Sequence, residues 1–420
     1  MSPIVVVAII TVAAVALLVT QVLRPAVVAL LIWLAVYATG LVPAGSLFNS
    51  LVNSSTLLIL FMFIICETAT AVGIPQRIGR VLLRFAKTER SAVMVVLIIS
   101  LILSSFLGNM AVAVMVVPIA IGMCNANPSY AKGKLLMATA FGSITGGFNT
   151  LIGNVGNSMT RAILLEQGYD IGFWGFGKIG LPLSIVMILV IFFFGNKILP
   201  NSSDIPESRI VEESKTEAAP RWKLAVTSVV FHVVIVGMML ESYIGIPVHI
   251  VAMIGAIVLL ATRVIKAEEA FRAVNWSTII FFAGLLTLSS AITSSGAADL
   301  VARWVVDILN GQTNTYWIYV VIFVVICVAT QLISNGALMS IMFPIAISIA
   351  KQLNFDPVAI VMLVTVSASC SFMTPMATPL NAYIMGVGNF KMADFAKPGI
   401  VITILFGIVS IVMLPIIWPV

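Results

Sequence analysis

Apolar segments of about 20 residues or more follow one another along almost the whole sequence. A helix needs about 20 apolar residues to cross the roughly 30 Å hydrocarbon core of a bilayer. Hydrophobic residues make up 61% of the 420 residues and charged residues only 9%, whereas about 25% of an average soluble domain is charged. So few charges cannot cover so much apolar surface in water. We therefore expect an all-α polytopic membrane protein, and the same numbers exclude a nucleic-acid partner.

Two apolar stretches, about 91–124 and 316–352, are too long for a single span. Each is interrupted near its middle by polar residues around Asn109 or Asn335. Non-helical backbone at membrane depth is tolerated only where it lines a protected cavity. We therefore predict two re-entrant helical hairpins. Full spans are predicted at about 4–23, 25–43, 54–74, 135–165, 178–199, 222–241, 247–264, 277–295, 357–388 and 397–418.

The distribution of Lys and Arg supports this layout and sets its orientation. With the N-terminus outside, all 22 basic residues except Arg161, Lys178, Arg303 and Lys351 fall on the cytoplasmic side. Cytoplasmic loops carry such an excess of positive charge. The hydrophilic segment 200–221 is then a cytoplasmic linker, and we expect a multi-pass protein of the cell (inner) membrane.

The two halves of the chain, 1–199 and 222–420, resemble each other. Asn109 precedes Pro118 by nine positions, and Asn335 precedes Pro344 by the same nine. A second match aligns two polar segments without gaps, Phe148–Asn157 with Phe372–Asn381. We predict unwound helices at about 146–157 and 370–381. Each half then contains five spans and one hairpin, and because five is odd the second half enters the membrane inverted.

Inverted repeats with interrupted helices are typical of secondary transporters with a binding site at the membrane midplane. Helix N-termini at the breaks would direct N–H groups and partial positive charge at an anion. Unwound carbonyls and side-chain oxygens would suit an alkali cation. An Asn amide can serve either ligand. The candidates from the residues alone are Asn109, Asn157, Asn335 and Asn381.

Other functions remain open at this point. Glu67 is the only acidic residue in the middle of a span, and an intramembrane carboxylate is a candidate proton site. A proton-coupled permease or an anion exchanger is therefore one alternative, and a passive anion channel is another. The sequence has no Walker A loop, its two histidines are far apart and it has no paired mid-span carboxylates, so we expect no ATP-driven transport, no enzyme and no covalent cofactor.

The hairpin and unwound-helix motifs resemble those of the divalent anion:sodium symporter family, within the ion transporter superfamily. The segment Gln331–Pro344 is similar to that family's Ser-Asn-Thr hairpin signature. The segment Thr374–Asn381 is similar to its Gly-Thr-Pro-Pro-Asn unwound helix. The resemblance covers nearly the whole chain, and it implies Na⁺-coupled symport of a small anion such as a dicarboxylate or sulfate.

The resemblance also implies a set of site residues. One sodium site would use Ser104, Gly108, Asn109 and Gly153. The other would use Thr330, Ile333, Asn335 and Ala377. Substrate contacts would come from Asn109, Ser334, Asn335, Thr378 and Pro379.

Three departures from the family pattern bear on the substrate. The first tip reads Gly108-Asn109-Met110 and lacks both hydroxyls, the second tip has Gly336 in place of threonine, and the first unwound helix has Asn154-Val155 in place of Thr-Pro. Losing a hydroxyl that holds a carboxylate costs about 1–3 kcal/mol in a desolvated site. Coupling to a cation is thus better supported than a dicarboxylate substrate, and a smaller or singly charged anion fits.

Finally, the family implies a homodimer in which a static scaffold carries a moving part. Two amphipathic stretches, Gln76–Arg90 and Ala297–Asn310, would lie at the lipid interface on opposite faces of the membrane. They would serve as anchors at the membrane surface or, on the more specific hypothesis, as arms that connect the scaffold to the hairpins during an elevator-type motion.

Overall fold

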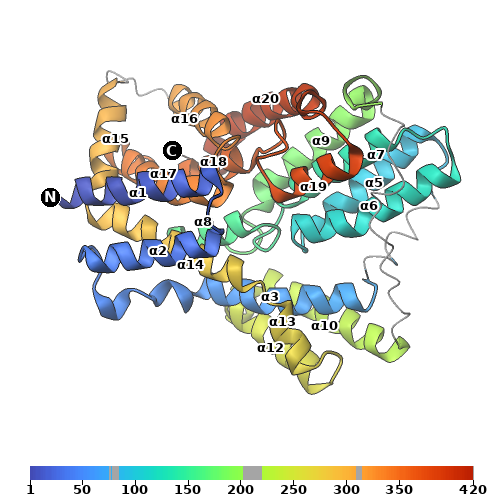
Figure 1. Cartoon of the computed structure of the whole chain (residues 1–420), viewed down its shortest axis with the longest axis horizontal. Helices are drawn as coiled ribbons and strands as arrows, with labels where there is room; N and C mark the ends of the chain where they lie inside the picture. Colours follow the sequence, from blue (N-terminus) through green and yellow to red (C-terminus); the bar gives the residue numbers. More distant parts are fainter. Residues whose placement is uncertain (75–76, 78–84, 202–219, 309–314, 420) are drawn as a thin grey trace.

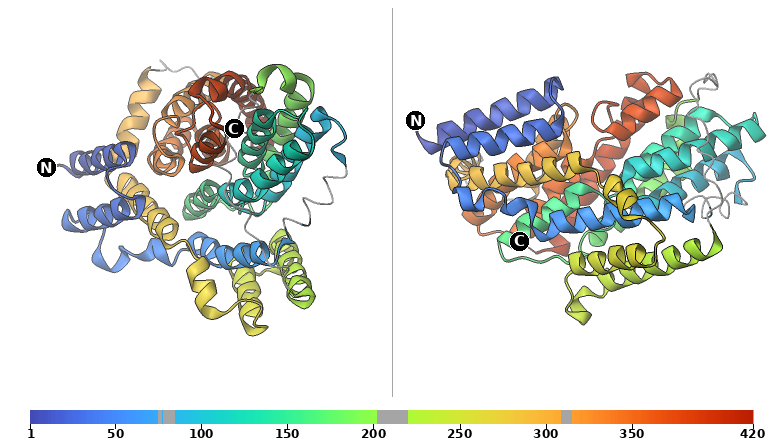
Figure 2. Two further views of the ribbon diagram at one scale, coloured as in Figure 1. Left: turned by 45° about the vertical axis from the view of Figure 1, so that its right-hand side comes forward. Right: turned by 60° about the horizontal axis from the view of Figure 1, so that its bottom comes forward.

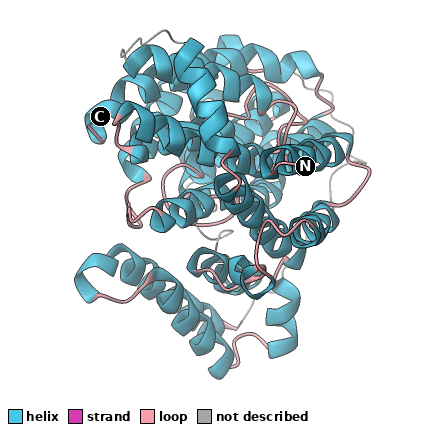
Figure 3. Ribbon diagram, turned by 90° about the vertical axis from the view of Figure 1, so that its left-hand side faces the viewer, coloured by secondary structure: helices cyan, strands magenta, loops and turns pink. Residues whose placement is uncertain are grey.

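The computed structural model describes residues 1–74, 77, 85–201, 220–308 and 315–419. Every regular element in these ranges is a helix (Figure 3). Eight helices are long and apolar enough to span a membrane. The expectation of an all-helical, multi-pass membrane protein is therefore confirmed.

One group of helices, which we call the frame, packs along one side of the molecule (Figure 1). Its members are α1 (Pro3–Thr20), α2 (Pro25–Ala38), the short 3₁₀ turns Ala44–Ser46 and Asn49–Leu51, α3 (Ser54–Ala71), α10 (Arg221–Met239), α11 (Glu241–Ile244), α12 (Val248–Ala261), α13 (Ala267–Ala273) and α14 (Trp276–Ser294). Helix α14 packs closely on α2 because Gly284 has no side chain. A Cβ at that position would collide with Ala29. A hydrogen bond of 2.9 Å from Trp33 Nε1 to Thr287 Oγ1 ties the same pair.

The remaining helices form a second group, the site body, which packs around a common core (Figure 2). Its members are α5 (Glu89–Ser104), α6 (Asn109–Ala126), α7 (Lys132–Gly146), α8 (Val155–Glu166), α9 (Gly177–Ile198), α16 (Thr315–Ala329), α17 (Asn335–Leu353), α18 (Pro357–Ser369), α19 (Pro379–Gly388) and α20 (Met392–Ile417). Helix α15 (Ala297–Ile308) connects α14 to this group and packs against α17.

Aromatic side chains from both halves of the chain meet in the core of the site body. Phe372 contacts Phe141 and Phe406 edge to face, with ring centroids 5.6 and 5.3 Å apart. Phe148, the sequence counterpart of Phe372, contacts Phe406 at 6.1 Å. Such pairs contribute about 0.5–1.5 kcal/mol each beyond the area that they bury. The two halves therefore share one core instead of folding separately.

The helices break where the sequence is polar. Non-helical backbone separates α5 from α6 at 105–108 and α16 from α17 at 330–334. Longer breaks separate α7 from α8 at 147–154 and α18 from α19 at 370–378. By length and composition, α6 with 18 residues and α17 with 19 residues are both among the candidate spans.

One of the two predicted arms is a helix in the structure. Residues 297–308 form the helix α15, while most of the predicted stretch Gln76–Arg90 lies outside the described residues and α5 begins at Glu89. The linker predicted at 200–221 also lies almost entirely outside them.

Candidate functional site

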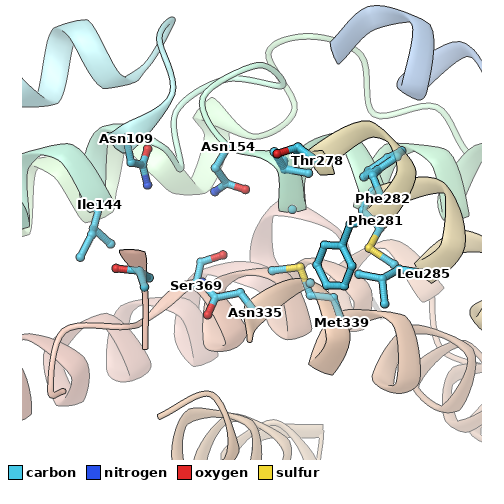
Figure 4. A pocket seen from close by; sticks show the side chains of 15 residues that line it. Asn109, Ile144, Asn154, Thr278, Phe281, Phe282, Leu285, Asn335, Met339 and Ser369 are labelled. Carbon is cyan, nitrogen blue, oxygen red and sulfur yellow. The ribbon is translucent and has the colours of Figure 1, made fainter. Parts of the chain in front are cut away.

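All four breaks lie beside one pocket of about 250 Å³ (Figure 4). Asn109 and Asn154 lie on one side of it, Asn335 and Ser369 on the other, and α14 of the frame closes a third side (Figure 4). The lining residues are Asn109, Ile144, Asn154, Val155, Gly156, Met159, Thr278, Phe281, Phe282, Leu285, Asn335, Gly336, Met339, Ser369 and Thr378.

Four helices begin at this pocket. Helices α6 and α17 start at Asn109 and Asn335, and no side chain caps the N–H groups of their first turns. Helices α8 and α19 are capped: Asn154 Oδ1 accepts from the Asn157 N–H at 3.0 Å, and Thr378 Oγ1 accepts from the Asn381 N–H at 3.2 Å. Helix N-termini carry about half a positive charge. The pocket is thus polarised for an anion, although no charged residue lines it within the described part of the chain.

At the second tip, two hydroxyl groups hold the Asn335 amide. Asn335 Oδ1 accepts hydrogen bonds from Thr330 Oγ1 at 2.9 Å and from Ser371 Oγ at 3.0 Å. Thr330 Oγ1 is also 2.5 Å from the Ala368 carbonyl oxygen. Thr330 and Ser371 are fully buried. With its oxygen engaged in this way, the Asn335 amide has its nitrogen left to donate toward a ligand.

The first tip has a different set of neighbours. One terminal atom of the Asn109 amide lies 2.7 Å from Ser104 Oγ and 3.2 Å from each of the carbonyl oxygens of Ser143 and Gly153. All three neighbours are oxygens, so hydrogen bonding assigns the amide nitrogen to this position. If the side-chain oxygen turned there instead, four oxygens would converge, which is the hard donor set that an alkali cation prefers.

The two long breaks are held by the same hydrogen bonds. Asn157 Nδ2 donates to the carbonyl oxygens of Gly147 and Thr150 at 2.8 and 2.7 Å. Asn381 Nδ2 donates to those of Ser371 and Thr374 at 2.6 and 3.0 Å. The register between the two sets of residues is the one that the gapless sequence alignment predicts. Asn157 and Asn381 are fully buried, so their amides support the unwound backbone and do not face the pocket.

Hydroxyls also join each long break to its neighbouring tip. Thr150 Oγ1 donates to the Ser105 carbonyl oxygen, and Thr374 Oγ1 donates to that of Gln331 at 3.4 Å. Ser105 precedes Asn109 by the same four residues that separate Gln331 from Asn335. Tip and unwound helix are therefore connected within each half.

The structure brings most of the predicted site residues together. Asn109, Asn335 and Thr378 line the pocket, Ser104 and Thr330 lie at the tips behind it, and Gly153 lies in the first long break, with its carbonyl oxygen near Asn109. Gly108, Ser334 and Pro379 are exposed residues at the starts of their helices, and neither Ser334 nor Pro379 lines the pocket. Ile333 is half-buried in the second tip, and Ala377 is buried in the second long break.

Glu67 lies elsewhere. Helix α3 ends at Ala71, so Glu67 lies nearer to the helix end than the predicted span implied, and its side chain is exposed. It lines a separate cavity of about 570 Å³ in the frame, together with Lys223, Glu269 and Arg272. The helix ends three residues before the predicted end of the span, although the apolar run continues as far as Ile74. Glu67 is not part of the pocket between the tips.

Several residues of the site were missed from sequence. Ser371 is the counterpart of Gly147, one position before the aligned segments, and extending the alignment by that residue would have found it. Ser143 contributes only its carbonyl oxygen, which no side-chain pattern reveals. The α14 wall, Thr278 to Leu285, looks like any apolar span in sequence and becomes part of the site through packing.

A solved structure shares the fold of this chain. The crystal structure of the YdaH transporter of Alcanivorax borkumensis, described as having an unusual topology, superposes with a TM-score of 0.58. The match covers 94% of this chain and 98% of that chain at 11% sequence identity. At this identity the likeness concerns the fold alone.

Comparisons with known sequences identify the family. The uncharacterized transporter YfbS of Escherichia coli is 32% identical over 207 residues, which cover 49% of this chain and 33% of that protein. The sodium-dependent dicarboxylate transporter SdcS of Staphylococcus saprophyticus is 23% identical over 349 residues, which cover 74% of this chain and 66% of that protein. This chain thus spans less than two thirds of the length of either relative. The family described as citrate transporter matches residues 15–365. This chain belongs to that family of membrane transporters, and it is not an enzyme.

Proposed function

We propose that this protein is a secondary active symporter that couples transport of a small anion, such as a dicarboxylate or sulfate, to Na⁺. The observation that carries the proposal is the convergence of four helix N-termini on one uncharged pocket. Helix N-termini bind anions through free N–H groups and the helix dipole. A site without a fixed cation can also release its substrate, which a carrier requires on each cycle.

Oxygen-rich tips support Na⁺ as the coupling ion. Around Asn109, the candidate ligands are Ser104 Oγ and the carbonyl oxygens of Ser143 and Gly153. Around Asn335, they are Thr330 Oγ1, Ser371 Oγ and the Ala368 carbonyl oxygen. These neutral donors suit a monovalent cation of hard character. A bound cation would add positive charge next to the anion pocket, so each ligand would favour binding of the other.

We further propose an arrangement in the membrane. The halves 1–199 and 222–420 form inverted repeats, and α5–α6 and α16–α17 are re-entrant hairpins. The N-terminus lies outside the cell, and the linker 200–221 lies in the cytoplasm. The site body moves along the frame as an elevator, with α15 as one of its arms, and two copies associate through the frame in the inner membrane. The closest helix packing lies within each group, α5 on α7 in the site body and α2 on α14 in the frame, and it supports this division.

Uptake into proteoliposomes tests the function. Purified protein is reconstituted, and the entry of labelled succinate, citrate and sulfate is measured with an inward Na⁺ gradient, with K⁺ replacing Na⁺, and with a pH gradient alone. Accumulation above equilibrium that requires Na⁺ supports the proposal. Accumulation driven by the pH gradient alone would indicate a proton-coupled permease. Uptake that occurs only when the liposomes are preloaded with an anion would indicate an exchanger. Flux that never exceeds equilibrium would indicate a channel.

A further inference from the structure

Arg161 is a buried arginine that the proposed binding site does not use. It lies on α8, two turns beyond the Asn154 cap that lines the pocket, and only 5% of its surface is exposed. A buried guanidinium requires charged partners, because isolated burial of a charge is very costly. Arg161 has two such partners, and they belong to different parts of the molecule.

The first partner, Asp170, belongs to the site body. It follows α8 in the chain and accepts from Arg161 Nε at 3.0 Å and from Nη2 at 2.9 Å. Burial raises the pKa of the Asp170 carboxyl, but the hydrogen bonds from Arg161 and Gly172 and the arginine charge outweigh it and hold the pKa below its usual range. Asp170 is therefore ionised at neutral pH, and it moves wherever α8 moves.

The second partner, Glu241, belongs to the frame. Its two carboxylate oxygens lie 2.9 and 2.8 Å from Arg161 Nη2, and Oε1 also accepts from the Val248 N–H at 3.1 Å. Glu241 begins α11, between α10 and α12, which contact each other and α3. Among the described residues, this is the one ion pair that joins the site body to the frame; the other two, Lys134–Glu89 and Arg161–Asp170, lie within the site body.

The Arg161–Glu241 pair and the pocket lie toward opposite faces of the membrane in the topology proposed above. The pocket touches α14 at Thr278 to Leu285, near the helix start that the positive-inside pattern assigns to the cytoplasm. Arg161 and Glu241 lie toward the opposite, outer face in the same topology. The pair thus joins the two bodies on the face away from the pocket.

We propose that the Arg161–Glu241 ion pair is a latch that holds the site body in the observed position and opens each time the site moves to the outer face. The proposal rests on the elevator motion proposed above. When the site body moves, Arg161 keeps Asp170 and loses Glu241, while Glu241 keeps the Val248 N–H and gains water. Asp170 makes release possible because it leaves the buried arginine paired in both positions.

This assignment makes opposite predictions for the two carboxylates. Glu241→Gln removes a charge partner that Arg161 has only in the latched position, so the released position gains population. Asp170→Asn removes the partner that Arg161 has in both positions, and the released position, where no other carboxylate remains, loses population. We expect the ratio of the two positions to change by about tenfold in each direction.

Distances between spin labels measure that ratio. Labels are attached to cysteines placed at exposed positions, Ser129 in the α6–α7 loop of the site body and Glu268 in α13 of the frame. The native residues Cys66, Cys124, Cys327 and Cys370 are first replaced by alanine. Distance distributions are recorded for the parent, Glu241→Gln and Asp170→Asn proteins, each with and without Na⁺ and citrate, and thermal unfolding verifies that each protein is folded.

Each outcome decides one point. Opposite shifts in the two variants support the latch. Shifts in the same direction overturn the latch and leave Arg161 with a purely structural role. The same conclusion follows if the distance distributions of both variants are unchanged while Na⁺ and citrate still change that of the parent. A single distance that no ligand or variant changes overturns the elevator motion on which the latch depends, whatever the uptake measurements show about the anion and the cation.

Discussion

The two tips of the pocket share one backbone design but differ in side-chain chemistry. In both halves a buried asparagine, Asn157 or Asn381, ties the long break with two hydrogen bonds in equivalent positions. At the second tip, however, the hydroxyls of Thr330 and Ser371 hold the Asn335 amide. At the first tip, a glycine, Gly147, stands where the second half has Ser371.

This difference shows which features the shared fold requires and which are free to vary. Carbonyl oxygens left by an unwound helix must be satisfied wherever the break occurs, so the tying asparagine is present in both halves. The groups that face the ligand carry no such requirement. The second tip therefore presents a preset amide donor, while the first tip offers mainly carbonyl oxygens around Asn109.

The largest expected effect tests whether the tips form the site at all. Asn335→Ala removes the amide that two hydroxyls orient toward the pocket, and we expect Na⁺-driven uptake to fall by at least about 100-fold. Glu67→Gln, in the separate cavity of the frame, should leave uptake within about twofold of the parent. Initial rates in proteoliposomes measure both. An inactive Glu67→Gln with a nearly normal Asn335→Ala would contradict the tip site and favour proton coupling.

A second test compares one position between the halves. A Cβ added at Gly153 would lie 2.7 Å from the Gly147 carbonyl oxygen and 3.0 Å from its Cα, whereas the equivalent Ala377 already carries a Cβ. Because backbone must shift, Gly153→Ala should destabilise the protein by about 1–3 kcal/mol. The reverse change, Ala377→Gly, should cost about 0.5–1 kcal/mol. Thermal unfolding in detergent measures both, and equal losses would mean that the two breaks are packed alike.

The smallest expected effect concerns the difference between the tips themselves. Ser371→Ala removes one of the two hydroxyls on Asn335 Oδ1 and makes the second tip more like the first. Losing one such hydrogen bond costs about 1 kcal/mol, so the Na⁺ concentration for half-maximal uptake should rise about fivefold. Ser367→Ala is the matched control, because its hydroxyl donates to the Leu363 carbonyl within α18. If both variants behave like the parent protein, Ser371 does not set the orientation of Asn335.

Much of this protein follows from sequence because the membrane limits the possible folds. Runs of apolar residues predict helices wherever water cannot satisfy the backbone, and polar residues inside such runs predict breaks. Asn109 and Asn335 were identified in this way, and each starts a helix at the pocket. The alignment of Phe148–Asn157 with Phe372–Asn381 also predicted which residues of the two halves occupy equivalent places.

Tertiary structure alone decided how these pieces meet. The α14 wall, the Ser143 carbonyl oxygen and the pairing of Arg161 with Glu241, 80 residues away, depend on contacts between distant segments that no local pattern encodes. Glu67 illustrates the same limit, since an acid in an apolar run is mid-span or exposed depending on where the helix ends. Local sequence determines where a helix must break, because the unpaired backbone is costly there. Packing determines which broken ends face one another, because that choice depends on the surfaces of every helix at once.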